Sequence, residues 1–326
     1  MVTLASFPLW TPSLYSISMR VTGRRLTAGL FLLCTVGSVA SAQQPSRDAL
    51  TARLAERIGA VSGAAVAVSY RDLASGDSVD IGADVDFHAA STMKIPVMLE
   101  VVRSAEQERL GLAQGILLIN RFHSIVDGSP YSLNAGDDGD SSMYARVGHR
   151  VPVRELLERM IVRSSNLATN ALIALVGADR TTSAARALGA SRIRVLRGVE
   201  DQKAFDAGLI NTTTSADLAV LLRRIERADG LRPASAKLMK DVLLRQEFND
   251  EIPAGVPAGT AVAHKTGAIT ATLHDAAIVY PPDRPPYVLV VLTRGIPSES
   301  VARALIVDIS RLVWQHSSKS AGAGAR

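Results

Sequence analysis

The sequence contains very little cysteine. Cys34 is the only one among 326 residues, and it falls in an N-terminal stretch that we expect to be removed from the mature protein. A mature chain without cysteine has no disulfide, no thiol nucleophile and no cysteine-based metal site. Its fold must be held by a hydrophobic core, and 47% hydrophobic residues over this length are enough to build one.

Metal and nucleic-acid sites are also poorly supported. The six histidines include no pair with His-x-x-x-His spacing, so we expect neither a catalytic metal nor another cofactor. The segment at 137–140 is rich in aspartate, but it lacks the alternating ligand spacing of a calcium loop, and we interpret it as a solvated loop. Arg20, Arg24 and Arg25 account for three of the five net positive charges. No basic patch for nucleic acid is therefore expected.

The same three arginines introduce a targeting segment. They precede an apolar stretch at 26–39, and small residues at 40–42 then provide a cleavage site. We predict a signal peptide over 1–42, with Met19 as an alternative start, and a periplasmic or secreted protein. The apolar stretch is too short for a membrane span, so none is expected after cleavage.

Hydrophobic periodicity predicts helices and strands in separate blocks. We expect helices at 46–58, from 91, at 153–190 with a break at 163–166, at 214–228, at 234–246 and at 298–315, and strands at 64–70, 78–81, 193–196, 261–264, 273–280 and 287–293.

This order predicts an α/β (α+β) fold in one catalytic domain over 43–316. The first hairpin and the last strands form one antiparallel sheet flanked by the terminal helices. We assign 43–90 and 261–316 to this sheet lobe and 91–260 to an inserted all-helical lobe. The small polar tail at 317–326 is expected to be disordered.

Ser91 and Lys94 open an apolar run and are spaced to lie on one face of a helix. A serine at a helix N-terminus lies where backbone N–H groups and the helix dipole favour developing negative charge. Its hydroxyl needs a base to become a nucleophile, and Lys94 is a candidate if its pKa is lowered. Alone, the pair is weak evidence, because a capping serine followed by an exposed lysine is the more common explanation of this spacing.

Two further patterns occur downstream. Ser164 and Asn166 flank Ser165 at the break between two helices, where they could enter a cleft or simply cap the next helix. Lys265, Thr266 and Gly267 end an apolar strand. Burying a lysine there costs free energy unless its charge is used in the site. Alternatively, the lysine could lie on an exposed edge strand and prevent that edge from pairing with another chain. The glycine would allow close approach of another backbone or a ligand.

Taken together and in this order, the three patterns resemble those of serine β-lactamases and penicillin-binding proteins. The similarity extends over about 46–315, with an insertion between the first two motifs that contains the polar loop at 123–142. Asn170 matches a structural asparagine of class A β-lactamases. Asn211 to Thr214 resemble the stretch that follows the class A Ω-loop.

The resemblance implies roles for individual residues. Ser91 would attack the substrate carbonyl, Lys94 would act as a base, and Ser164 would relay a proton to the leaving nitrogen. Asn166 would contact the substrate amide. Further binding groups would be Lys265 and Thr266 for the substrate carboxylate, beside Gly267, and the N–H groups of Ser91 and Ala268 for the oxyanion.

The sequence also departs from class A. Glu200 stands about where class A has the glutamate that activates water for deacylation, but the usual Leu-Asn pair after it is missing. Ser165 stands where class A commonly has aspartate. His274 occupies the position of an arginine that often binds carboxylate, and Arg294 is a candidate to compensate.

Three functions follow as hypotheses. The first is a class A-like serine β-lactamase that opens β-lactams through an acyl-enzyme on Ser91. The second is a DD-peptidase or penicillin-binding-type amidase that acts on cell-wall peptides. The third is a β-lactam-binding sensor that does not hydrolyse its ligand. In each case the expected partner is a small molecule or a cell-wall peptide, and the protein is expected to be a monomer.

Overall fold

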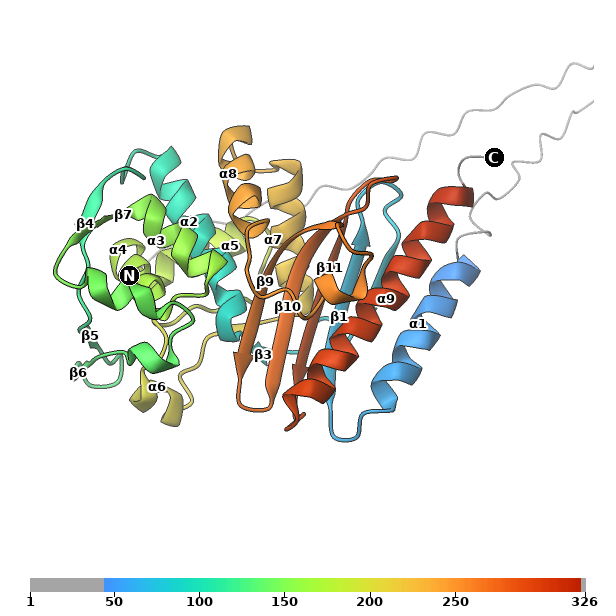
Figure 1. The fold of residues 1–326 in the computed structure, drawn as a ribbon, viewed down its shortest axis with the longest axis horizontal. Coiled ribbons are helices and arrows are strands. Elements are labelled where there is room, and N and C mark those ends of the chain that lie inside the picture. The colour runs from blue at the N-terminus through green and yellow to red at the C-terminus, as the bar shows by residue number, and fades with distance from the viewer. Residues whose placement is uncertain (1–43, 324–326) are drawn as a thin grey trace, which may run out of the picture. The chain divides into compact units, whose positions relative to one another are not determined.

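A five-stranded antiparallel sheet organises the protein. The computed structural model describes residues 44–323, and the predicted signal peptide at 1–42 lies outside them. The strand order is β2-β1-β11-β10-β9, so the first and last parts of the chain meet in the middle of the sheet (Figure 1). The strands are β1 (Ala65–Asp72), β2 (Ser78–Ile81), β9 (Ala261–Ile269), β10 (Thr272–Tyr280) and β11 (Tyr287–Arg294).

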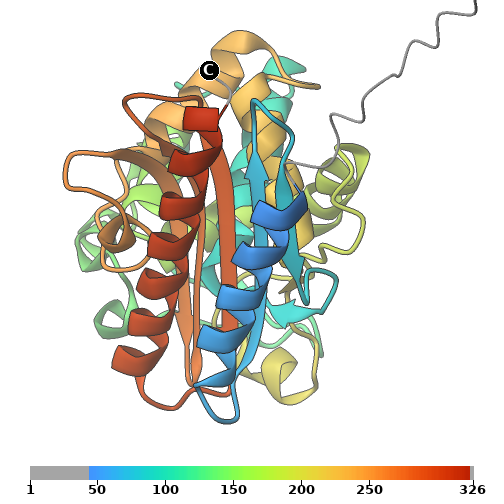
Figure 2. The ribbon, with the colours of Figure 1, turned by 90° about the vertical axis from the view of Figure 1, so that its right-hand side faces the viewer.

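Helices cover both faces of this sheet. All residues of β11 except Arg294 are buried, as expected for an apolar strand that is covered on both sides. On one face α1 (Gln44–Gly59) and α9 (Glu299–Ala323) lie side by side, as Figure 2 shows. Leu54 of α1 and Leu305 of α9 are fully buried there, and each such leucine contributes about 1.5 to 3 kcal/mol by leaving water. Arg57 joins the two helices through an ion pair with Asp308 of 2.8 Å.

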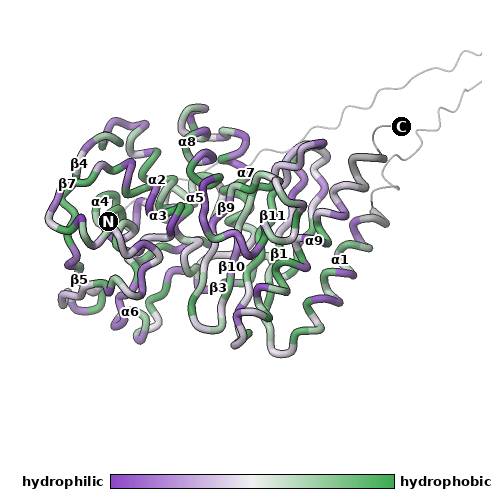
Figure 3. Tube along the Cα trace, viewed as in Figure 1, coloured by the Kyte–Doolittle hydropathy of each residue, from purple (hydrophilic) through white to green (hydrophobic). Residues whose placement is uncertain are grey.

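The second face carries the helical part of the chain. Hydrophobic segments concentrate in the sheet and at its helix contacts, whereas hydrophilic and hydrophobic segments alternate along α1 (Figure 3). Helix α7 packs on β1, β10 and β11, and α8 packs on β9. Helices α3, α4 and α5 pack against α2, in which every residue from Lys94 to Val102 is buried. The bounds are α2 (Lys94–Glu106), α3 (Val153–Val162), α4 (Asn166–Val176), α5 (Ala178–Ala187), α6 (Gln202–Asp206), α7 (Ser215–Arg227) and α8 (Pro233–Leu243).

Short elements complete the connections. Three two-stranded ladders and four 3-10 helices lie within residues 44–323. The ladders pair β3 (Phe87–His88) with β8 (Thr212–Thr213), β4 (Gly115–Leu117) with β7 (Arg150–Pro152), and β5 (Phe122–His123) with β6 (Pro130–Tyr131); the 3-10 helices are η2 (Ala90–Met93), η3 (Ala135–Asp137), η4 (Ser141–Arg146) and η5 (Pro253–Gly255).

Most predicted elements are present, including the break at 163–166, and four expectations need correction. Helix α7 packs on the sheet, so the range 91–260 is not a separate helical lobe. The predicted helix at 153–190 also breaks at Gly177, whose φ of 87° cannot continue a helix. The expected strand at 193–196 contributes only one isolated bridge, from Arg194 to Thr212.

The fourth correction concerns the tail. Helix α9 continues to Ala323, so most of the segment predicted as disordered from 317 is helical. The helix has partners around the point where disorder was expected to begin. His316 contacts Asp77 through Nε2 at 2.7 Å, and Arg284 donates to the Ser317 hydroxyl at 3.2 Å. None of the helices between residues 44 and 323 combines the length and the hydropathy that a membrane crossing requires.

Candidate active site

Ser91 lies in the 3-10 turn η2, which leads directly into α2. Gly267 of β9 passes close to this turn. A Cβ atom on Gly267 would lie only 3.0 Å from the Ser91 nitrogen and 3.1 Å from the Thr92 nitrogen. Only glycine allows this approach without displacement, which explains the glycine in the strand motif. The approach places Ala268, the next residue of β9, at the edge of the hollows that Ser91 lines.

Lys94 follows one turn later and is completely buried. Its Nζ donates to the Ser164 carbonyl oxygen at 2.7 Å, to the Ser164 Oγ at 3.1 Å and to the Asn166 Oδ1 at 2.8 Å. Burial, assisted by the nearby positive charge of Lys265, lowers the pKa of Lys94 well below its usual value. A lysine with a lowered pKa populates its neutral form more readily, and the neutral amine can accept a proton.

The second lysine, Lys265, contacts the same Ser164 hydroxyl. The Nζ of Lys265 is buried and donates to the Ser164 Oγ at 3.1 Å and to the Thr266 carbonyl oxygen at 2.9 Å. Burial lowers the pKa of Lys265 to about 7. A hydroxyl has two lone pairs and one proton. When both lysines donate to the Ser164 oxygen, its proton is free to be given to another group.

Glu200 reaches this cluster through Asn166, whose Nδ2 donates to the Glu200 Oε1 at 2.6 Å. The loop before Glu200 is held by Asn170. The Val199 N–H donates to the Asn170 Oδ1 at 2.7 Å, and the Asn170 Nδ2 donates to the Val199 carbonyl at 3.0 Å. Desolvation by the surrounding protein raises the pKa of Glu200, so its carboxylate is a better base than an ordinary one.

Two hollows meet at Ser91. The first has a volume of about 640 Å³ and is lined by Glu200, Arg197 and Phe205. The second, of about 300 Å³, is lined by Ser164 and by the strand from Thr266 to Ala268. Ser91, Asn166 and Ala268 belong to both hollows. A group attached to Ser91 can therefore extend in two directions.

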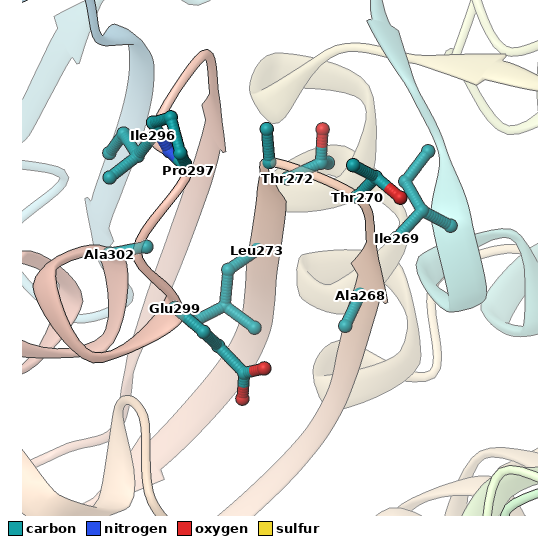
Figure 4. Close-up of a pocket in the computed structure, with 10 residues that line it drawn as sticks. Ala268, Ile269, Thr270, Thr272, Leu273, Ile296, Pro297, Glu299 and Ala302 are labelled. Atoms are coloured by element: carbon teal, nitrogen blue, oxygen red, sulfur yellow. The ribbon is translucent and has the colours of Figure 1, made fainter.

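A third hollow lies at the turn between β9 and β10 (Figure 4) and has a volume of about 360 Å³. Its lining consists of aliphatic and threonine side chains with Glu299 as the only charged group. In Figure 4 the Glu299 carboxylate points away from Ile296 and Pro297. Because its lining contains neither serine nor lysine, this hollow lacks the set of groups found around Ser91.

The two residues considered for binding a carboxylate from the neighbouring strands do not reach the hollows. The Nε2 of the buried His274 donates to the His88 carbonyl at 2.9 Å, while its Nδ1 accepts the Thr293 N–H at 3.1 Å. Burial lowers the pKa of His274 to about 4, so it is neutral. Arg294 donates to the Asp86 carbonyl at 2.8 Å and lies over the Phe87 ring. The expectation that Arg294 compensates is therefore wrong.

Sequence reasoning missed several charged residues of the site, and Arg303 and Asp138 are two of them. Arg303 of α9 lines the second hollow opposite the β9 strand, where it also pairs with Glu251 and Glu299. Its place in an amphipathic helix gave no signal. Asp138, in the segment taken as a solvated loop, accepts the backbone N–H groups of Asn166 and Leu167. Within 44–323 no group of three His, Cys, Asp or Glu side chains could hold a metal ion.

Comparison with known proteins shows to which family the chain belongs. A model of the β-lactamase enzyme family matches residues 49–317. The chain belongs to the β-lactamase enzyme family. The β-lactamase AST-1 of Nocardia asteroides is 30% identical over 315 residues, which cover 90% of this chain and 96% of that protein. The extended-spectrum β-lactamase PER-1 of Pseudomonas aeruginosa is 26% identical over 73% of this chain and 77% of its own length.

Solved structures with a similar fold include a penicillin-binding-type protein by name and a β-lactamase. The structure of PBP-A matches with a TM-score of 0.72 and 26% identity, over 83% of this chain and 96% of that one. An ancestral (GNCA) class A β-lactamase matches with a TM-score of 0.70 and 29% identity, over 82% and 99% of the two chains. These findings confirm the resemblance to class A-like serine hydrolases and the predicted fold class.

Proposed function

We propose that the protein hydrolyses β-lactams through an acyl-enzyme on Ser91, as a class A-like serine β-lactamase. The observation that carries the proposal is the convergence of Lys94 and Lys265 on one hydroxyl, that of Ser164, beside Ser91. A nucleophile, a base of lowered pKa and a proton relay are then present in one cleft, which is the set that acyl transfer to serine requires. The β-lactamases similar to this chain support the choice of substrate.

Acylation would use the two lysines and the two serines. Neutral Lys94 takes the proton of Ser91 as its Oγ attacks the lactam carbonyl, and the N–H groups of Ser91 and Ala268 stabilise the oxyanion. When the ring C–N bond breaks, Ser164 gives its proton to the leaving nitrogen and regains one from a neighbouring lysine. Lys265 and Thr266 hold the substrate carboxylate, and Arg303 adds positive charge on the opposite side of the same hollow.

Deacylation would use Glu200. Its carboxylate removes a proton from water, the resulting hydroxide attacks the ester carbonyl, and the ester C–O bond breaks as the same proton is returned from Glu200 to the leaving Ser91 oxygen. The hydrogen bond from Asn166 keeps the Glu200 carboxylate beside the cluster. The raised pKa of Glu200 matches this task, because a stronger base removes the proton of water more effectively.

The first experiment mixes the chain from Gln43 with a chromogenic cephalosporin and follows turnover and covalent mass together. We expect sustained turnover in the wild type, none with Ser91→Ala, and one equivalent of trapped acyl-enzyme with Glu200→Gln. A loss of general-base catalysis of this kind costs about 10²- to 10⁴-fold in rate. Normal deacylation by the Glu200 variant would remove that residue from the mechanism.

A penicillin-binding-type amidase is the second candidate. PBP-A matches this fold as closely as the ancestral β-lactamase does, and a mutant of PBP-A was solved as an acyl-enzyme complex with penicillin G. The stretch after Glu200 lacks the Leu-Asn pair of class A, and there Asp201 caps α6 by accepting the Ala204 N–H at 3.1 Å. One stable adduct without turnover, together with release of terminal D-alanine from cell-wall peptides, would favour this candidate.

Location and assembly belong to the same proposal. The N-terminal pattern supports export to the periplasm or the medium, where β-lactams and cell-wall peptides are met. Mass spectrometry of the secreted protein would detect an N-terminus at Gln43. We further propose a monomer, because a complete set of catalytic side chains comes from one chain; light scattering would test it.

A further inference from the structure

The aspartate-rich segment at 137–140 contacts the Ser164–Asn166 turn directly. Both carboxylate oxygens of Asp138 accept the Asn166 N–H at 3.0 Å, and Oδ2 also accepts the Leu167 N–H at 2.9 Å. These N–H groups belong to the first turn of α4 and have no partner within the helix. Ser165 accepts the next N–H, that of Ala168, at 3.2 Å. Asp138 and Ser165 thus cap α4 together.

The two residues after Asp138 hold the same turn. A Cβ atom on Gly139 would lie 2.3 Å from the Arg163 carbonyl oxygen, so the two backbones touch and only glycine fits. Asp140 is 1% exposed and pairs with Arg159 at 3.2 Å and with Arg163 at 3.5 Å. Three consecutive residues of the loop therefore contact the end of α3, the turn and the start of α4.

The turn needs this support because its backbone is strained. Ser164 has a φ of 57°, in the left-handed region that a serine adopts only at a cost of about 1 kcal/mol or more. This conformation points one hydroxyl at both lysines. Without the contacts from the loop, the turn could relax to an ordinary backbone conformation and carry the hydroxyl away from them.

We propose that Asp138 is a positioning residue for the chemistry of this site. It holds the turn from outside the three motifs, so that Ser164 stays between the lysines and Asn166 stays between Lys94 and Glu200. The inference rests on the proposed function. The carboxylate comes from the inserted loop, whereas Ser165 at the centre of the motif carries none.

The negative charge of Asp138 acts on the same groups. It raises the pKa of Lys94, which also faces Lys265 and Glu200, and it raises the pKa of Glu200, which also faces Asn166, Asp137 and Lys94. Removing this charge lowers both pKa values. Each group must be deprotonated to act as a base, so the acidic limbs of kcat/KM and of kcat should both move to lower pH.

The test compares Asp138→Ala, Asp138→Asn and the control Asp127→Asn. Asp127 lies in the same inserted loop but pairs with the surface residue Lys203, away from the turn. The readouts are acylation of Ser91 by penicillin G, followed by covalent mass, steady-state kcat and KM from pH 5 to 9, and the melting temperature.

We expect Asp138→Ala to slow acylation by about 10²-fold, the loss that a displacement near 1 Å can cause. Asp138→Asn keeps an acceptor oxygen and should recover most of this rate while its pH limbs remain shifted. Asp127→Asn should match the wild type. A lowered melting temperature with unchanged acylation and unchanged pH limbs in both Asp138 variants would overturn the proposal.

The design separates this inference from the proposed function. If the wild type forms an acyl-enzyme but does not turn over, β-lactam hydrolysis fails as a function. Acylation still requires Ser164 between the two lysines, so the rate of adduct formation in the Asp138 variants continues to test the positioning role.

Discussion

The two walls of the cleft are built in different ways. One wall is strand β9, whose residues from Ala261 to Ile269 pair with β10 along their whole length. The other wall consists of the Ser164–Asn166 turn and the loop before Glu200, and both are held by side chains that bond to backbone groups. The strand wall distributes its support over many bonds. The loop wall depends on a few side chains, so each of them has a large effect.

The largest effect is expected from crowding the strand wall. Gly267→Ala places a methyl group 3.0 Å from the Ser91 nitrogen, and the paired strand cannot move away. The oxyanion donors should be displaced, and kcat should fall by about 10²- to 10³-fold, as on loss of one such donor. Steady-state kinetics would measure this. Gly59→Ala, where an added Cβ meets nothing within 4 Å, is the matched control, and a wild-type kcat in both variants would contradict the prediction.

An intermediate effect is expected from loosening the loop wall. Asn170→Ala removes both hydrogen bonds to Val199, next to Glu200. Deacylation should slow by about 10- to 100-fold while acylation is nearly retained, so the acyl-enzyme accumulates. The backbone groups of the half-buried Val199 also lose their partner, which should lower the stability by about 1 kcal/mol. Pre-steady-state bursts would measure the rates of acylation and deacylation. Denaturant unfolding would measure the loss of stability. Equal slowing of both steps would show that Asn170 supports the whole cleft and not the Glu200 loop alone.

The smallest effect concerns a buried carboxyl group, that of Glu251, which lines the second hollow. Glu251 is 4% exposed, its Oε1 accepts from Arg303 at 3.3 Å, and its Oε2 has no hydrogen-bond partner in the part of the chain that the structure describes. Burial raises the pKa of Glu251 to about 7. The folded protein thus binds a proton more tightly than the unfolded chain, and stability falls as the pH rises from about 4.5 to 7.

Glu251→Gln should remove this slope and raise the free energy of unfolding above pH 7 by about 1 to 3 kcal/mol. Urea unfolding at pH 5 and pH 8 would measure it. Glu299→Gln serves as the control, because Glu299 shares Arg303 but is exposed. An unchanged difference between the two pH values in the Glu251 variant would rule out its carboxyl as the source of the slope.

The sequence predicts the strand wall better than the loop wall. The apolar runs around 261–294 predict strands of a buried antiparallel sheet, and the structure contains them. Lys265 lies on one of these strands, as expected. Lys94, Ser164 and Asn166 also meet as the motifs imply. Short motifs predict these contacts because the residues within each motif are close together in the chain.

The contacts of the loop wall join residues that are far apart in the chain. Asp138 and Asn166 are separated by 28 residues and have no shared periodicity. An aspartate in a polar segment looks the same whether it is solvated or caps a distant helix, so its role was missed. The position of Arg294 was missed for the same reason. Its side chain is directed by the Asp86 carbonyl and the Phe87 ring, and no local sequence pattern reveals these contacts.

The packing of the first helix against the last brings the two ends of the described chain together, and this allows the order of the elements along the chain to be changed. Arg53 donates to Gln315 at 3.0 Å and Arg57 pairs with Asp308, so α1 and α9 run antiparallel and the two ends of the described chain lie together. The first and last helices are therefore neighbours in space although they lie at opposite ends of the chain. A short linker between these ends would permit circular permutation, with new termini in an exposed turn such as that at 126–129, while every strand keeps its neighbours.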